Sequence, residues 1–251
     1  MDEDEYERMY AAEERQWWYA GMRAITDALL REPLRRRPPS GRPLLVDAGC
    51  GTGQNLRHFG TWARTVGFDL SLTALRFCRS RGVAATRASV LALPVRDASV
   101  DVVTSFDVIY HGWVESDLGA VRELVRVLRP GGVLVVRVPA LMLLWGAHDE
   151  AVHSRHRYTA RELEDLFEAA GLESVRVTYC NSILFPLLAL RRTLDRWLSR
   201  HGSDVEFLPT PVEWLFLRFL RIEAGLIGRG FRLPIGASVM GVGRRADASR
   251  G

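Results

Sequence analysis

The sequence contains no lysine: all 34 basic residues among its 251 are arginine, and asparagine and glutamine occur only twice each. Because lysine and asparagine codons are AT-rich, this bias is typical of a GC-rich bacterial genome. The net charge of +4 is compatible with a nucleic-acid partner. Apart from Arg35–Arg37, however, the arginines are spread along the chain, so we expect a solvated surface and no nucleic-acid partner.

Cysteine and long apolar runs are also scarce. The three cysteines, Cys50, Cys78 and Cys180, are widely spaced and form no CxxC or Cys/His cluster, which predicts free thiols and argues against structural zinc. No apolar run approaches the roughly 18 to 20 residues of a membrane-spanning helix. The first residues, MDEDEYERMY, are acidic where a signal peptide is basic. We therefore expect a cytoplasmic protein without a transmembrane segment.

The middle of the chain alternates short apolar runs with amphipathic stretches of about 10 to 15 residues, the pattern of a doubly wound α/β sheet. The helix expected over 159–171 has Thr159 as N-cap, Glu162 three residues later, and Gly171 at its end. The other helices are expected over 54–60, 71–82 and 116–130, the last closed by Pro130. Strands are expected over 44–49, 65–69, 83–88, 99–110, 132–140, 174–180 and 237–245.

Two regions flank or interrupt this pattern. Residues 4–30 have helical spacing of aromatic and apolar side chains and predict one or two helices, followed by a Pro/Arg/Gly linker over 32–43. Residues 181–236 are rich in Leu, Phe, Trp and Arg and predict a helical insertion. We therefore divide the chain into an N-terminal helical cap and linker (1–43), a core (44–180), the insertion (181–236), and a final strand and tail (237–251).

The sharpest motif is DAGCGTG, Asp47 to Gly53, placed between a predicted strand and a predicted helix. Its glycines let the backbone pass close to a ligand and leave amides free at a helix N-terminus. The next strand ends at Asp69, about 20 residues on, where an acid commonly binds the ribose of an adenosine cofactor. The spacing is G-x-G-x-G rather than the G-x-G-x-x-G of a dinucleotide site, which disfavours a nicotinamide oxidoreductase.

With FDLS, LALPVRDASVDVV and ELVRVLRPGGVLVV, this motif resembles the class I S-adenosylmethionine (SAM)-dependent methyltransferases, in particular their small-molecule group. The resemblance covers about 44–140. It implies a Rossmann-like sheet of strand order 3-2-1-4-5-7-6 with the last strand antiparallel, and SAM as cofactor with S-adenosylhomocysteine (SAH) as product. Ser89 stands where the group usually has an acid near the adenine. The implied cofactor residues are Asp47, Gly49, Cys50, Gly51, Gly53, Asp69, Leu70, Ser89, Val90, Leu91 and Phe106.

Two histidine regions are candidates for a general base, which is needed only if the acceptor must lose a proton. His111 follows the fourth strand, and a packing role is equally compatible with the sequence. In the second region, WGAHDEAVHSRHRYT, we take His153 as the second candidate base. A metal site there is the weaker alternative. A hydrogen-bonded loop clamp that includes His148, Arg157 and Tyr158, either structural or facing the substrate, is favoured.

The remaining aromatic residues indicate an acceptor pocket. Trp17, Trp18 and Tyr19 are expected to cap the core, to cover the active site, or both. The apolar and arginine-rich insertion suits an apolar or lipid-like acceptor, a peripheral membrane contact, or a dimer interface. We interpret the chain as a methyltransferase acting at oxygen or nitrogen of a small molecule in bacterial secondary (natural-product) or cell-envelope metabolism, as a monomer or homodimer. The alternatives are a non-catalytic SAM-binding or scaffold protein and a methyltransferase acting on RNA or protein.

Overall fold

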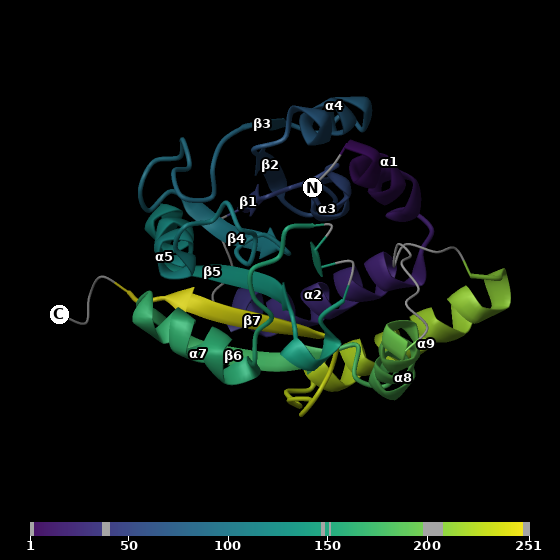
Figure 1. The fold of residues 1–251 in the computed structure, drawn as a ribbon. Helices are drawn as coiled ribbons and strands as arrows, with labels where there is room; N and C mark the ends of the chain where they lie inside the picture. The colour runs from purple at the N-terminus through teal and green to yellow at the C-terminus, as the bar shows by residue number, and fades with distance from the viewer. Residues whose placement is uncertain (1–2, 37–40, 147–148, 151, 198–207, 248–251) are drawn as a thin grey trace.

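The computed structural model of the protein describes residues 3–36, 41–146, 149–150, 152–197 and 208–247. Its centre is a seven-stranded sheet of order β3-β2-β1-β4-β5-β7-β6 (Figure 1). β7 is antiparallel to both β5 and β6, and the other neighbouring strands are parallel. The predicted strand order and antiparallel last strand are therefore confirmed. The strands are Leu44–Ala48 (β1), Arg64–Asp69 (β2), Ala85–Arg87 (β3), Val100–Phe106 (β4), Leu128–Pro139 (β5), Leu172–Cys180 (β6) and Ser238–Arg245 (β7).

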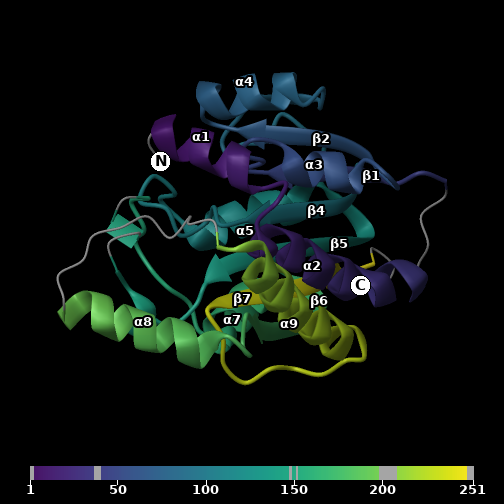
Figure 2. The same ribbon diagram turned by 90° about the vertical axis from the view of Figure 1, so that its right-hand side faces the viewer.

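Helices cover both faces of the sheet (Figure 2). Neighbouring residues of one strand face different cores: Leu45 and Val102 pack with α2, α3 and α9, whereas Val46 and Val103 pack with α5 and α7. This alternation follows from the two-residue side-chain period of a strand. The helices are Glu3–Ala12 (α1), Trp17–Arg36 (α2), Gln54–Phe59 (α3), Leu72–Ser80 (α4), Asp117–Val127 (α5), Met142–Leu144 (η1, a 3₁₀ turn), Ala160–Ala169 (α7), Phe185–Trp197 (α8) and Thr210–Gly228 (α9).

Several element boundaries differ from the sequence prediction: β4, for example, ends at Phe106 rather than at residue 110. Two of the differences have a visible cause. α2 runs to Arg36, into the expected linker, because the carbonyl of Pro33 accepts a hydrogen bond of 2.8 Å from Arg244 and Arg36 pairs with Glu32 one turn back. β5 begins at Leu128, before Pro130, because Leu128 already pairs with Val100 across an irregular register. A bulge of this kind tolerates the missing N–H of a proline. The capping box of α7 forms as expected, with Thr159 and Glu162 bonded reciprocally.

The N-terminal helices and the insertion meet on one face of the sheet. A Cβ on Gly21 of α2 would lie 2.2 Å from Cδ1 of Leu220 in α9, so glycine permits the close approach of these two helices. α8 and α9 follow β6 and precede β7. α2 and α9, about 190 residues apart in sequence, thus lie side by side on this face of the sheet (Figures 1 and 2).

Candidate active site

A cavity of about 780 Å³ lies at the carboxyl ends of β1, β2 and β4. Its lining includes residues 49–51 after β1, 69–71 after β2 and 106–108 around the end of β4, together with residues of α1, α2, α8 and α9. Ligands of doubly wound sheets bind at this edge, and the volume is that of a small-molecule site.

The glycine loop adopts the backbone that only glycine tolerates easily. Gly49 and Gly51 have φ of 81° and 53°, the left-handed region. A Cβ on Gly49 would lie 2.1 Å from Cγ2 of Val108, and one on Gly51 would lie 2.9 Å from Cε of Met9. β2 fixes the start of the loop, since the amides of Gly49 and Cys50 both donate hydrogen bonds to the carbonyl of Phe68. Its narrow path therefore leaves one backbone face turned to the cavity.

Asp69 braces this loop from the neighbouring strand. Its Oδ2 accepts the amide of Gly51 at 2.8 Å and its Oδ1 accepts the amide of Ser71 at 2.9 Å. Burial raises the pKa of Asp69, and the two backbone donors act in the opposite direction. Tyr6 of α1 lies beside it: burial, then the charge of Asp69, raise the pKa of the Tyr6 phenol to about 12. Each carboxylate oxygen retains acceptor capacity toward the cavity.

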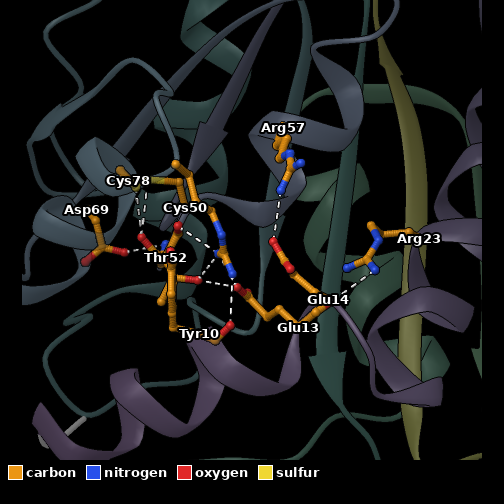
Figure 3. Close-up of polar contacts among 11 residues, drawn as sticks. Tyr10, Glu13, Glu14, Arg23, Cys50, Thr52, Arg57, Asp69 and Cys78 are labelled. Atoms are coloured by element: carbon orange, nitrogen blue, oxygen red, sulfur yellow. Dashed lines mark hydrogen bonds and ion pairs between the residues drawn. The ribbon is translucent and has the colours of Figure 1, made fainter.

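The end of α1 is fastened to the glycine loop by a buried polar cluster (Figure 3). Glu13, 6% exposed, accepts hydrogen bonds from the Thr52 hydroxyl and, at 2.6 Å, from Nη1 of Arg81. Arg81 also donates to the carbonyls of Thr52 and Tyr10, and its guanidinium lies 4.2 Å from the centre of the Tyr10 ring. Burial raises the pKa of Glu13, against the lowering effect of these partners. The cluster holds α1 over the loop, so Tyr6 and Met9 become cavity walls.

The region that the resemblance assigns to adenine is built from one turn. Val90 is buried and lines the cavity, whereas Ser89 and Leu91 are not among the lining residues. The Ser89 hydroxyl accepts the amide of Leu91 at 3.2 Å. Ser89 therefore fixes this turn, and Val90 presents the apolar surface.

His111 is buried at the cavity wall, with 8% exposure, between the rings of Tyr110 and Trp113. Its Nδ1 lies 2.8 Å from the carbonyl oxygen of Val152. Because a carbonyl only accepts, Nδ1 carries the hydrogen and Nε2 of the neutral ring is an acceptor. Burial lowers the pKa of His111 to about 4, and this effect outweighs the hydrogen bond to the carbonyl of Val152, which raises the pKa. The ring is therefore neutral near pH 7 and keeps one tautomer.

The second histidine region contains a buried ion pair. Arg157 donates from Nε and Nη2 to Asp149 at 2.8 and 2.9 Å, and from Nη1 to the carbonyl of Ala140. Tyr158 donates to Asp117 of α5. These bonds clamp the segment between β5 and α7, and both Arg157 and Asp149 line the cavity. His153 is exposed and does not line it.

His148 lies outside the described residues. Within the described ranges, no group of three His, Cys, Asp or Glu side chains is arranged to hold a metal ion. The three cysteines are free and buried.

The N-terminal aromatics and the insertion form a second wall. Trp17, Trp18 and Tyr19 all line the cavity. The backbone amide of Trp17 donates to Oε2 of Glu213 in α9 at 2.7 Å, and its ring meets Phe216 edge-on at 5.1 Å. Apart from Asn181 and Arg191, the side chains that the insertion contributes are apolar: Leu187, Leu188, Leu208, Val212 and Phe216.

Sequence reasoning did not find an ion pair in the cavity wall, between Arg137 of β5 and Asp107 after β4. Nε of Arg137 donates to Asp107 Oδ2 at 2.9 Å, and Nη2 donates to the same oxygen. The guanidinium also lies 4.6 Å from the ring centre of Trp18 and 5.1 Å from that of Phe106. The available signal was an arginine inside the apolar strand VLVVRVP, where a charged residue needs a buried partner.

The structure thus brings most of the predicted residues to one cavity. Asp47 and Gly53 of the glycine motif and Tyr158 of the clamp do not line it. In the part of the chain that the structure describes, no helix combines the length and the apolar character needed to cross a membrane. The predicted residues that line the cavity are Trp17, Trp18, Tyr19, Gly49, Cys50, Gly51, Asp69, Leu70, Val90, Phe106, His111 and Arg157.

Comparisons with known proteins agree with this architecture. Residues 46–136 match the family model described as a methyltransferase domain. The chain is 37% identical over 139 residues to the probable S-adenosylmethionine-dependent methyltransferase of Mycolicibacterium smegmatis, covering 53% of each chain. It is 36% identical over 166 residues to one from Mycobacterium tuberculosis, covering 64% of this chain and 57% of that one. The chain therefore spans a little over half the length of these curated relatives.

Another relative is named for action on tRNA. The human probable tRNA methyltransferase 9B is 35% identical over 113 residues, covering 45% of this chain and 24% of that protein. Among solved structures, a chain of the complex between the Haloferax volcanii Trm112 methyltransferase activator and its methyltransferase partner shares the fold. Its TM-score is 0.60 at 21% identity, covering 98% of this chain and 96% of that one. Taken with the strand order and the glycine loop, the family model and the curated relatives show that residues 46–136 form a methyltransferase domain of the class I SAM-dependent kind.

Proposed function

We propose that this chain is a SAM-dependent methyltransferase that methylates a small molecule at oxygen or nitrogen. One observation carries the proposal. The cavity that begins at Gly51 and Asp69 continues beyond the glycine loop to His111, Trp17 and Phe216. A site that only bound SAM would not need this second volume, whereas methyl transfer requires room for an acceptor beside the cofactor.

The residues at the near end of the cavity fit SAM. The glycine loop gives a close backbone approach, since a Cβ on Gly49 or Gly51 would collide with a neighbouring side chain. Asp69 is oriented by two backbone amides and would bind the ribose hydroxyls, and Val90 would contact the adenine. The cofactor supplies a methyl group on a sulfonium, a good leaving group, so this chain chiefly has to align the acceptor and exclude water.

His111 would act on the acceptor. Its Nε2 lone pair belongs to a neutral, fixed tautomer, so it would accept a hydrogen bond from an acceptor hydroxyl or amine and take up its proton as that group is methylated. His153, which is exposed and does not line the cavity, is the second candidate base. The aromatic side chains at 17–19 and the apolar wall from α8 and α9 would exclude water from the acceptor.

A macromolecular acceptor is the second candidate, because relatives named as tRNA methyltransferases match the chain. Two features support the small-molecule proposal instead. The arginines are dispersed over the chain rather than gathered, and the cavity is walled by α1, α8 and α9. We infer further that the protein works in the cytoplasm, in bacterial secondary or cell-envelope metabolism.

Two experiments test the proposal. Isothermal titration should show binding of SAM and SAH but not of NAD, because the loop lacks dinucleotide spacing. Purified protein incubated with SAM and pools of candidate acceptors should then give products heavier by one methylene, detected by mass spectrometry. Tighter binding of NAD than of SAM contradicts the cofactor assignment, and methylation of tRNA but not of small molecules favours the second candidate.

A further inference from the structure

The far end of the cavity is formed by strand ends that the cofactor residues do not reach. β5, β7 and β6 lie side by side there, with Pro139 paired to Ser238 and Ser238 paired to Cys180. Arg137 precedes this row on β5, and Asn181 follows it on β6. We call the space between these strand ends, the Trp18 ring and Phe216 the inner compartment; all of these wall residues except Cys180 line the cavity.

Arg137 is buried, and not all of its hydrogen-bond donors have partners among the described residues. It is 7% exposed, and its Nε and Nη2 both donate to one oxygen, Oδ2 of Asp107. Its Nη1 donates to no described residue. Arg157, the other buried arginine in the cavity wall, differs because all three of its side-chain nitrogens have partners. Arg137 therefore has a charged donor available to a ligand in the cavity.

Asn181 supplies a complementary atom. It is 2% exposed, has a φ of 57°, and lines the cavity. Its Oδ1 is buried without a hydrogen-bond partner among the described residues. A buried acceptor left unpaired is costly, so such an atom indicates a missing ligand donor or water. Arg137 and Asn181 stand two strands apart, about 10 Å across the sheet. They are also offset along the strands, because Arg137 pairs with Met240 whereas Cys180, next to Asn181, pairs with Ser238.

The positive φ of Asp107, 58°, adds a third indication. Left-handed backbone at a residue other than glycine is uncommon and gathers at ligand sites. This conformation directs Asp107 to Arg137 in a position where both charges face the cavity. The ion pair keeps the arginine oriented in the absence of ligand, while the side walls contributed by Trp18, Phe216 and Leu188 are apolar.

We propose that the inner compartment is an anion-binding acceptor subsite, in which Arg137 binds a carboxylate or phosphate of the methyl acceptor and the apolar walls hold its hydrocarbon or aromatic body. Guanidinium groups suit both anions because their planar N–H donors match the oxygen geometry. The inference rests on the proposed function and narrows its substrate class to amphipathic anions. The carboxylate of the cofactor's methionine end is the other source of the same chemistry, and the experiment separates the two.

The test uses octanoate and octan-1-ol, which share an eight-carbon chain and differ in charge, titrated into the full-length protein with and without saturating SAH. Octanoate should bind the wild type at least about tenfold more tightly than octanol, the size of one charge-assisted hydrogen bond. The double variant Asp107→Asn, Arg137→Met removes both charges and so leaves neither one buried alone. It should lose this preference while its octanol affinity stays within about threefold.

Two further variants keep the result interpretable. Asp101→Asn, Arg129→Met removes a matched ion pair of 2.5 Å from the opposite end of β5 and should retain the preference for octanoate. If the double variant at 107 and 137 does not fold, Arg137→Lys preserves the charge but loses the planar fork, and the preference should fall at least about threefold.

Three outcomes overturn the proposal. One is equal affinity of the wild type for octanoate and octanol. The second is an unchanged preference in the folded variants at position 137. The third is that the variants at position 137 bind SAH more weakly than the wild type, while their affinities for octanoate and for 5′-methylthioadenosine are unchanged. Because 5′-methylthioadenosine lacks the amino-acid end of SAH, this result assigns Arg137 to the cofactor. If the wild type prefers octanoate but binds neither SAH nor 5′-methylthioadenosine, the anion subsite stands and the proposed function fails.

Discussion

Asp47, the first residue of the glycine motif, should make the stability of the protein depend on pH. Its side chain is buried, with 1% exposure for the residue. Oδ1 accepts the hydroxyl of Thr104 at 2.7 Å, while Oδ2 has no partner among the described residues. Burial raises the pKa of Asp47 to about 7 from the value of 3.8 expected of an unperturbed aspartate. The folded state therefore holds this proton more tightly than the unfolded state does.

The sign and size of the effect follow from this difference. A group whose pKa is raised on folding stabilises the fold fully below its unfolded pKa, and the contribution is lost as the pH rises through the folded pKa. Three pKa units at 1.36 kcal/mol each correspond to about 4 kcal/mol lost between about pH 3 and pH 8. Between pH 5 and pH 8 alone the loss is about 2 to 3 kcal/mol.

Asp47→Asn removes this titration and keeps the shape of the side chain. Urea titrations at pH 5 and pH 8 give the free energy of unfolding of each protein. The difference between the variant and the wild type should be about 2 to 3 kcal/mol more favourable to the variant at pH 8 than at pH 5. Other groups titrate equally in both proteins and cancel in this comparison. Asp165→Asn, at a solvent-exposed position of α7, is the matched control and should show no such difference. An equal stability change at both pH values for Asp47→Asn refutes the reasoning, because it means that Asp47 titrates normally.

Three further predictions concern the site. Asp69→Ala should weaken SAM binding by about 2 to 4 kcal/mol in isothermal titration, because charge-assisted bonds to the ribose are lost; an unchanged dissociation constant in a folded variant contradicts the assignment. His111→Ala should lower turnover about 10²- to 10⁴-fold with SAM affinity nearly intact. Since the pKa of His111 is lowered to about 4, the turnover rate of the wild type should not change between pH 6 and pH 8 through protonation of this histidine. Glu13→Ala leaves Arg81 buried without its carboxylate and should cost about 3 to 5 kcal/mol of unfolding free energy in urea titrations, whereas a change below about 1 kcal/mol means that the cluster does not hold α1 in place.

Local patterns were sufficient for much of the fold. The glycine turn, the N-cap of α7 and the alternating apolar runs are set by backbone conformation and side-chain period, which act over a few residues. The strand order came from the resemblance carried by four motifs, and the structure has that order. The end of α2 was wrong by several residues because the hydrogen bond from Arg244, more than 200 residues away in sequence, stabilises its last turn.

The site shows the same division. The sequence alone determined which residues follow β1, β2 and β4, and hence that Gly49, Asp69 and His111 share one edge of the sheet, because parallel strands bring their carboxyl ends together. Only the tertiary structure decided the partners of buried charges: Glu13 with Arg81, and Asp107 with Arg137. Burying a charge is costly unless an opposite charge lies within a few ångströms, and which one does depends on how helices and strands distant in sequence pack. The spacing of two residues in the sequence does not predict whether their side chains lie this close in the folded protein.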